Sequence, residues 1–194
     1  LDDREPLVRN AVIEALSNLR YRPAVARFCE RLRQDPDFVV RSSAAEALGE
    51  LRAEEALGSL AEAVTFDPAS PVRGCAAQAL GLIGRDEVLE ALDTQGSRER
   101  DLCVLAEIHG ARARLGANGG VGGIILCVRE ADEQQALHLM GVLEDLLARN
   151  TPPGLIAHWG EVFGALSDLA ARHAIVRPHV AKVEGMAERQ AARS

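Results

Sequence analysis

Apolar and polar positions in the first half of the chain follow the period of amphipathic helices. From Pro23 to Arg33 the apolar positions are three or four residues apart, which places them on one helical face; they are Ala24, Val25, Phe28, Cys29 and Leu32. The run Asp35-Pro36-Asp37 then indicates a stop and a new start, because proline disfavours helical geometry in the residue before it. A second helix from about Phe38 to Leu51 is predicted to bury Val40, Ala44, Ala47, Leu48 and Leu51.

This pattern repeats every thirty-two residues. The segments Val8–Leu16, Val40–Leu48 and Val72–Leu80 align without gaps, and each begins with Val-Arg. We therefore predict an all-α fold of antiparallel helix pairs, which must stack to bury their apolar faces. An acid stands six residues before each of these arginines, and we expect acids and arginines to pair within and between neighbouring repeats as a structural ladder rather than to bind an anionic ligand. The ladder consists of Asp3, Arg9, Asp35, Arg41, Asp67 and Arg73.

Helix ends are signalled in the third repeat. Ser70-Pro71 predicts an N-cap followed by proline at the first helical position, and Gly84 predicts an end. Gly49 is interpreted as standing close to the end of the preceding helix. We assign 1–115 to repeats of this period.

The register fades after residue 93. Gly116 still follows Gly84 by thirty-two residues, but Leu105 stands where the arginine is expected. Residues 116–194 are predicted to be degenerate helical repeats or a C-terminal cap within the same continuous solenoid, with helices over 98–115, 130–149, 154–174 and 178–192. The glycine-rich run 116–123 lacks the lysine and hydroxyl residue of a phosphate-binding loop and is interpreted as a connector. The apolar run 124–128 is expected to be a core segment, or even a strand.

The repeated motif is an Asp followed by Val-Arg-x-x-Ala-Ala-x-Ala-Leu-Gly-x-Leu, and it is seen best from Val40 to Leu51. It resembles the HEAT repeat, and more closely the short bacterial HEAT-like repeat named after phycobilisome lyases. This resemblance covers residues 1 to about 93 and implies a right-handed α-solenoid whose second helices line a concave surface. On those helices the side chains opposite the apolar face point outward. We therefore expect a protein or peptide partner to contact Asn10, Glu14, Ser42, Ser43, Glu46, Cys75 and Gln78.

No catalytic or metal-binding constellation is predicted. Deoxyhypusine hydroxylase, which has similar repeats, carries His-Glu directly after Val-Arg to hold two irons. The corresponding pairs here are Asn10-Ala11, Ser42-Ser43 and Gly74-Cys75, which lack these ligands. His158 and Glu161 share a helical face, but a metal site needs three or four ligands. We therefore expect no metal, no cofactor and no catalytic residue.

Composition and charge limit the partners and the cellular location that we expect. The net charge is −7, and residues 1–100 hold 18 acids against 13 bases, residues 101–194 hold 11 against 9, so neither half is suited to a nucleic-acid backbone. The four scattered cysteines favour a reducing, cytoplasmic location, and no apolar run has the length of a membrane span. Because the chain begins at Leu1 rather than methionine, we expect it to be a segment of a longer polypeptide. Trp159, the only tryptophan, is expected in the core.

These features favour a non-catalytic scaffold or regulatory adaptor that binds a protein along the second helices. The alternative is an enzyme subunit of bilin-lyase type, which the resemblance to phycobilin lyases implies. Nucleic-acid binding, as in HEAT-like DNA glycosylases, is the third possibility, and the acidic balance opposes it. The sequence leaves the partner and the oligomeric state open.

Overall fold

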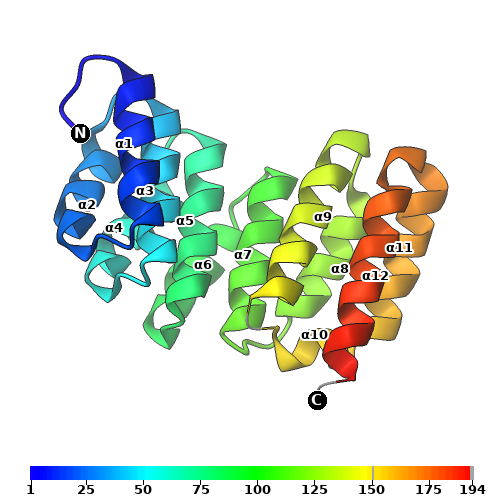
Figure 1. The fold of residues 1–194 in the computed structure, drawn as a ribbon. Coiled ribbons are helices and arrows are strands. Elements are labelled where there is room, and N and C mark those ends of the chain that lie inside the picture. Colours follow the sequence, from blue (N-terminus) through cyan, green and yellow to red (C-terminus); the bar gives the residue numbers. More distant parts are fainter. Residues whose placement is uncertain (150, 193–194) are drawn as a thin grey trace. The chain divides into compact units, whose positions relative to one another are not determined.

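A computed structural model describes residues 1–149 and 151–192 of the chain. The described residues form an all-α structure (Figure 1). The helices divide into two compact units, Leu1–Glu99 and Arg100–Ser194. Residues 100–115, which the sequence assigns to the same region as residues 1–99, therefore lie in the second unit.

The first unit repeats one helix pair with the predicted period. Its second helices are α1 (Pro6–Asn18), α3 (Phe38–Glu50) and α5 (Ser70–Ile83), and its first helices are α2 (Val25–Gln34), α4 (Leu57–Phe66) and α6 (Leu89–Gly96). Each first helix follows a short 3₁₀ turn: Arg22–Ala24, Glu54–Ala56 and Asp86–Val88. The helices α1, α3 and α5 pack in one row and α2, α4 and α6 in another, and α2 and α4 also pack on α3 and α5. The first unit is thus two layers of stacked helices.

A left-handed residue follows each second helix at the same place in the repeat. These residues are Arg20 (φ 53°), Arg52 (φ 48°), Gly84 (φ 78°) and Gly116 (φ 69°). The turn that Gly84 was predicted to make is therefore present four times at a spacing of thirty-two residues. Gly49 lies one residue before the end of α3, close to the helix end as expected. The expectation for Ser70 was wrong, because Ser70 is the first residue of α5 and Ala69 is the N-cap. Gly49 also permits close packing of α3 on α5, since a Cβ there would lie 2.7 Å from the Ala79 Cα.

Small and branched side chains fill the space between the layers. The largest completely buried residues of the first unit are Ile13, Phe28, Leu32, Leu48, Leu60, Leu80 and Leu92. Alanines at the centre of α3 and α5 have no exposed surface and let the helices approach closely. The helix α1 is less covered: Val8 is 44% exposed, whereas Val40 and Val72 at the equivalent position are 0% exposed. It therefore presents to solvent a surface that the other repeats bury.

The second unit contains α7 (Leu102–Arg114), α8 (Gly120–Glu130), α9 (Glu133–Ala148), α10 (Pro153–Ala157), α11 (Trp159–Arg172) and α12 (Arg177–Ala191). The helix α7 packs on α8 and α9, α8 packs on α11, and α12 packs on α9 and α11. One core joins them, and its most buried large residues include Ile124, Leu139, Met140, Leu143, Leu166 and Leu169. The expected helix 154–174 is interrupted at His158, which ends α10 and precedes α11.

The glycine-rich segment departs from the sequence interpretation. The connector is confined to residues 115–119, and the helix α8 begins at Gly120. The apolar run 124–128 is part of the core, as expected, but it forms a helix and not the strand that was the other possibility. Two glycines of α8 let this helix lie against α7. A Cβ at Gly120 would be 2.6 Å from the Ala113 backbone nitrogen, and a Cβ at Gly123 would be 2.2 Å from the His109 Nδ1. Glycines that lower helix propensity are retained here because they permit close contact.

Candidate functional site

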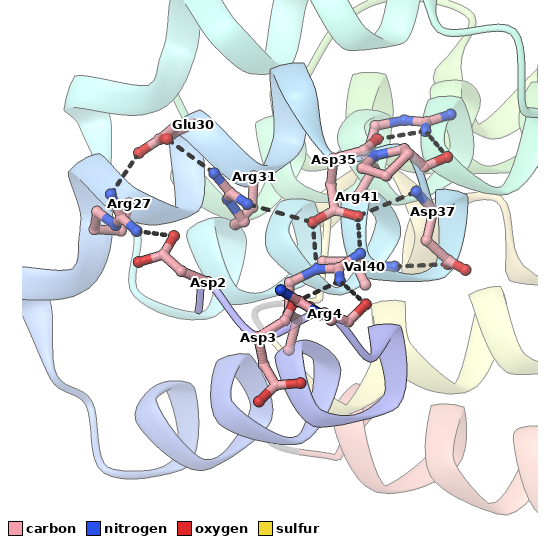
Figure 2. A network of polar contacts seen from close by, with 12 residues as sticks. Asp2, Asp3, Arg4, Arg27, Glu30, Arg31, Asp35, Asp37, Val40 and Arg41 are labelled. Carbon is pink, nitrogen blue, oxygen red and sulfur yellow. Dashed lines mark hydrogen bonds and ion pairs between the residues drawn. The ribbon is translucent and has the colours of Figure 1, made fainter.

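Charged side chains between α1, α3 and α5 form the ladder of the first unit, which Figure 2 shows around its first rung. The Arg9 Nε and Nη2 donate to the two carboxylate oxygens of Asp35 at 2.8 and 2.6 Å. The Arg9 Nη1 donates to the main-chain oxygens of Asp3 and Arg4 at 2.9 and 3.0 Å. The arginine of one repeat therefore binds the acid of the next repeat and the main chain of its own.

The second rung has the same geometry. The Arg41 guanidinium donates to both carboxylate oxygens of Asp67 at 2.8 and 3.0 Å. Its Nη1 donates to the main-chain oxygens of Asp35 and Pro36 at 2.9 and 3.3 Å. The Asp67 carboxylate also accepts the Ala69 N–H at 2.9 Å, and thus shapes the turn between α4 and α5.

The third rung contains a residue that sequence reasoning missed. Arg73 binds Glu99 with Nε and Nη2 at 2.7 and 3.0 Å, and donates to the main-chain oxygens of Asp67 and Pro68. Glu99 follows Asp67 by thirty-two residues, so its spacing was the available signal, whereas its residue type differs from the aspartates before it. Asp3, at the other end, contributes its main-chain oxygen to Arg9, and its carboxylate accepts the Glu5 N–H.

Burial and hydrogen bonding control the ionisation of the ladder. Burial opposes ionisation of Asp35, but hydrogen bonds from Arg9 and the Asp37 N–H outweigh it and hold the pKa of Asp35 below its usual value. The hydrogen bond to Asp67 likewise raises the pKa of Arg41. The side chains of the three arginines are only 6%, 13% and 16% exposed. Little of their surface is accessible to an anionic ligand.

The outward side of α1, α3 and α5 carries the residues predicted to contact a partner; we call it the second-helix face. Equivalent residues form parallel rows across the three helices. One row is acidic and polar (Glu14, Glu46, Gln78), the next is small (Ala11, Ser43, Cys75), and a third is apolar (Leu7, Val39, Pro71). Leu7 and Val39 are exposed, as are both glutamates.

Two contacts cross or brace this face. The Cys75 Sγ donates to the Glu46 Oε1 at 3.3 Å, from α5 to α3, and the Asn10 Nδ2 donates to the Glu14 Oε1 at 2.7 Å within α1. Neither Glu14 nor Glu46 forms an ion pair within residues 1–149 and 151–192. The face therefore presents two carboxylates whose charge no cation of the described chain balances.

The remaining predicted positions on this face are less accessible. Asn10, Ser42, Ser43, Cys75 and Gln78 are half-buried. The Asn10 Oδ1 and the Ser42 Oγ themselves are buried. Ser43 and the glutamates thus offer more polar surface to a partner than Ser42 does.

The five histidines all lie in the second unit, and His138 and His179 contact different glutamates. The His138 Nε2 lies 3.2 Å from the Glu107 Oε1, and this hydrogen bond raises the pKa of His138 although burial opposes the charge. The His179 Nδ1 lies 3.6 Å from the Glu144 Oε1. Across the described ranges, the side chains of His, Cys, Asp and Glu form no group of three or more that is suited to a metal ion.

The other singled-out residues of the second unit lie in or beside its core. Trp159 is half-buried and packs against that core. Cys127 is buried, and burial raises the pKa of its thiol to about 11. None of the helices in the part of the chain that the structure describes is long and apolar enough to cross a membrane.

The stacked helix pairs, the common turn and the arginine ladder define a class of protein, the α-solenoid built from short two-helix repeats. The sequence model of the HEAT repeats matches residues 1–49 and 25–104, which together span more than half of the chain. The chain therefore belongs to the HEAT-repeat family. No curated protein matches it.

Proposed function

We propose that this protein is a non-catalytic scaffold or adaptor that binds a protein segment on the second-helix face of its first unit. HEAT repeats commonly serve as protein-interaction scaffolds. The observation that supports this face is its arrangement in rows, because three equivalent helices offer apolar, small, and acidic or polar positions in the same order. A segment that crosses the three helices meets a carboxylate on α1 and on α3 and the Gln78 side chain on α5.

The spacing and charge of the rows suggest what such a segment carries. Packed helices lie about 8–10 Å apart, so equivalent residues recur at that distance across the face. In an α-helix, residues seven apart lie about 10 Å apart on one side, because each residue adds about 1.5 Å. Since Glu14 and Glu46 lack cationic partners within the described residues, we infer a segment with basic side chains at this repeat beside apolar ones.

A charge-reversal experiment tests the proposal. Peptides are first selected from a random library on the full chain, and their dissociation constants are measured by fluorescence anisotropy. The double variant Glu14→Arg/Glu46→Arg is compared with Glu62→Arg/Glu90→Arg, which changes the net charge equally at exposed positions of α4 and α6. We expect the first variant to weaken binding at least tenfold and the second to leave it unchanged. Equal effects of the two variants, or no selected peptide, would contradict the proposal.

The bilin-lyase alternative has its own test. The chain is incubated with a bilin and an apo-biliprotein, and the absorbance and mass of the biliprotein are followed. Absence of an adduct excludes that activity, whereas an adduct that requires the chain would replace the scaffold proposal.

A further inference from the structure

A cavity of about 550 Å³ lies within the second unit. Its wall combines two features that the sequence presents separately, the glycine-rich run and the pair His158 and Glu161. The lining residues include Gly116, Asn118, Gly119, Gly122, His158 and Glu161. Cavities that hold small molecules have about 300–1,000 Å³, so this one has a suitable size.

The glycines of the wall differ in their roles. Gly116 and Gly119 have φ angles of 69° and 79°, which other residues rarely adopt. Gly122 lies within α8 and has an ordinary helical φ, and a Cβ there would meet no atom within 4 Å. The packing of α8 on α7 therefore requires Gly120 and Gly123 but not Gly122. A larger side chain at Gly122 is expected to enter the cavity without disturbing the fold.

The polar side chains of the wall are those of Asn118, His158 and Glu161. His158 lies at the junction of α10 and α11, and its Nδ1 is 2.9 Å from the Gly154 main-chain oxygen. Because that oxygen only accepts, the Nδ1 carries a hydrogen, and in the tautomer with this single ring hydrogen the Nε2 is an acceptor. Glu161 lies three residues further along and is exposed. Its carboxylate forms no ion pair in the described ranges.

The rest of the wall is mostly apolar. Val121, Ile125 and Ala113 contribute side chains from α8 and α7. The nearby Arg112 does not line the cavity, and its Nη2 donates to the Asn118 main-chain oxygen at 3.1 Å. The cavity therefore offers an apolar surface, the Glu161 carboxylate, the His158 imidazole and the Asn118 amide, and no Lys or Arg lines it.

We propose that this cavity binds a small organic ammonium ion with an apolar body. The ammonium group donates hydrogen bonds to the Glu161 carboxylate and the His158 Nε2, and the apolar body contacts Val121 and Ile125. An anion is disfavoured because Glu161 would repel it, and the first N–H of α8, that of Gly120, is already bonded to the Ala117 oxygen at 3.3 Å. A metal ion is disfavoured because the described residues offer fewer than three suitable ligands.

The inference is independent of the proposed partner face, because residues of the second unit alone form the cavity. Trp159 directly follows His158, and as the only tryptophan it reports on this site by its fluorescence. The full chain is titrated with phenethylammonium and, separately, with 3-phenylpropionate, which has the same phenyl and ethylene groups but the opposite charge. We expect the ammonium compound to change Trp159 fluorescence saturably and to raise the melting temperature, and the carboxylate to do neither.

Three variants locate the binding. Glu161→Gln keeps the shape of the side chain and removes its charge, and is expected to weaken phenethylammonium binding about tenfold or more. Gly122→Met is expected to abolish binding by filling the cavity. Gly141→Met is the matched control, because Gly141 also lies in a helix with no atom within 4 Å of an added Cβ, and it does not line the cavity.

Far-UV circular dichroism and melting temperatures establish that each variant is folded. The proposal is overturned if 3-phenylpropionate binds as tightly as phenethylammonium or if neither binds up to its solubility limit. It is equally overturned if folded Gly122→Met and Gly141→Met bind alike, or if Glu161→Gln binds with unchanged affinity.

Discussion

Replacement of Arg41 by lysine tests whether hydrogen-bond geometry, rather than charge, joins neighbouring repeats. The substitution keeps a cation beside Asp67 but removes the planar fork. Arg41 now donates to both carboxylate oxygens of Asp67 and to the main-chain oxygens of Asp35 and Pro36. A single ammonium group cannot reach the carboxylate and these two oxygens from one position, so at least two of the four bonds are lost.

The loss in the free energy of unfolding can be estimated from the burial of the two side chains. The side chains of Arg41 and Asp67 are only 13% and 7% exposed, so water replaces few of the broken bonds. Bonds to charged groups contribute about 1.5–3 kcal/mol and neutral ones about 0.5–1.5 kcal/mol. We expect Arg41→Lys to lower the free energy of unfolding by about 2 kcal/mol. Asp67→Asn leaves the arginine charge without its counter-charge and is expected to cost about 3 kcal/mol.

Arg85→Lys is the matched control. Arg85 bonds Glu54 at 2.6 Å, but both side chains are more than half exposed, so the pair is hydrated and screened. Urea unfolding followed by circular dichroism gives the stabilities, and hydrogen exchange locates the change, since repeat arrays can open locally. We expect faster exchange in α3, α4 and α5 of Arg41→Lys. Equal stability of Arg41→Lys and Arg85→Lys would refute a geometric role for the ladder.

Three further predictions concern packing, pH and the exposed surface of α1. Gly120→Ala should destabilise the chain because its Cβ meets backbone at 2.6 Å, whereas Gly141→Ala, in open space, should be neutral or stabilising in the same urea assay. The hydrogen bond with Glu107 raises the pKa of His138, so the stability that this contact contributes is complete below the unfolded pKa and is lost as pH rises through the raised pKa. Melting temperatures should therefore fall as pH rises above about 6.5, the ordinary pKa of histidine, and His138→Gln should remove this slope. Fusing a second copy of residues 1–32 ahead of the chain should cover α1 and raise the melting temperature, and an unchanged value would show that the added repeat does not stack.

The repeat could be predicted because two independent patterns agree. Apolar residues at helical spacing predict helix pairs, and the recurrence of Val-Arg fixes how one pair follows another. The starts of α3 and α5 at Phe38 and Ser70 differ by the predicted thirty-two residues. The acidic partner of Arg73 could be located only by spacing, because a glutamate replaces the aspartate there. A search by residue type alone passes over Glu99.

The second unit was less predictable because packing there depends on absent side chains. Glycines ordinarily weaken a helix, and the run 116–123 therefore indicates a connector. In the structure Gly120 and Gly123 lie where α8 meets α7, and the helix is stabilised by the contacts that they permit. Such contacts join residues from different helices, so local sequence does not reveal them. For the same reason the meeting of His158 with the glycine-rich run in one cavity could not be predicted from either segment.

The backbone keeps the thirty-two-residue period over a longer stretch of the chain than the Val-Arg motif does. Gly116 retains the left-handed turn, and α7 begins thirty-two residues after α5, although Leu105 has replaced the ladder arginine. The turns and close helix contacts therefore suffice for the geometry, and the ladder adds stability where it is present. The ladder and the turns do not involve the outward side of α1, α3 and α5, where Glu14 and Glu46 occupy equivalent positions and accept hydrogen bonds from Asn10 and Cys75. Residues that the fold leaves free to vary are the ones through which a repeat protein distinguishes its partners.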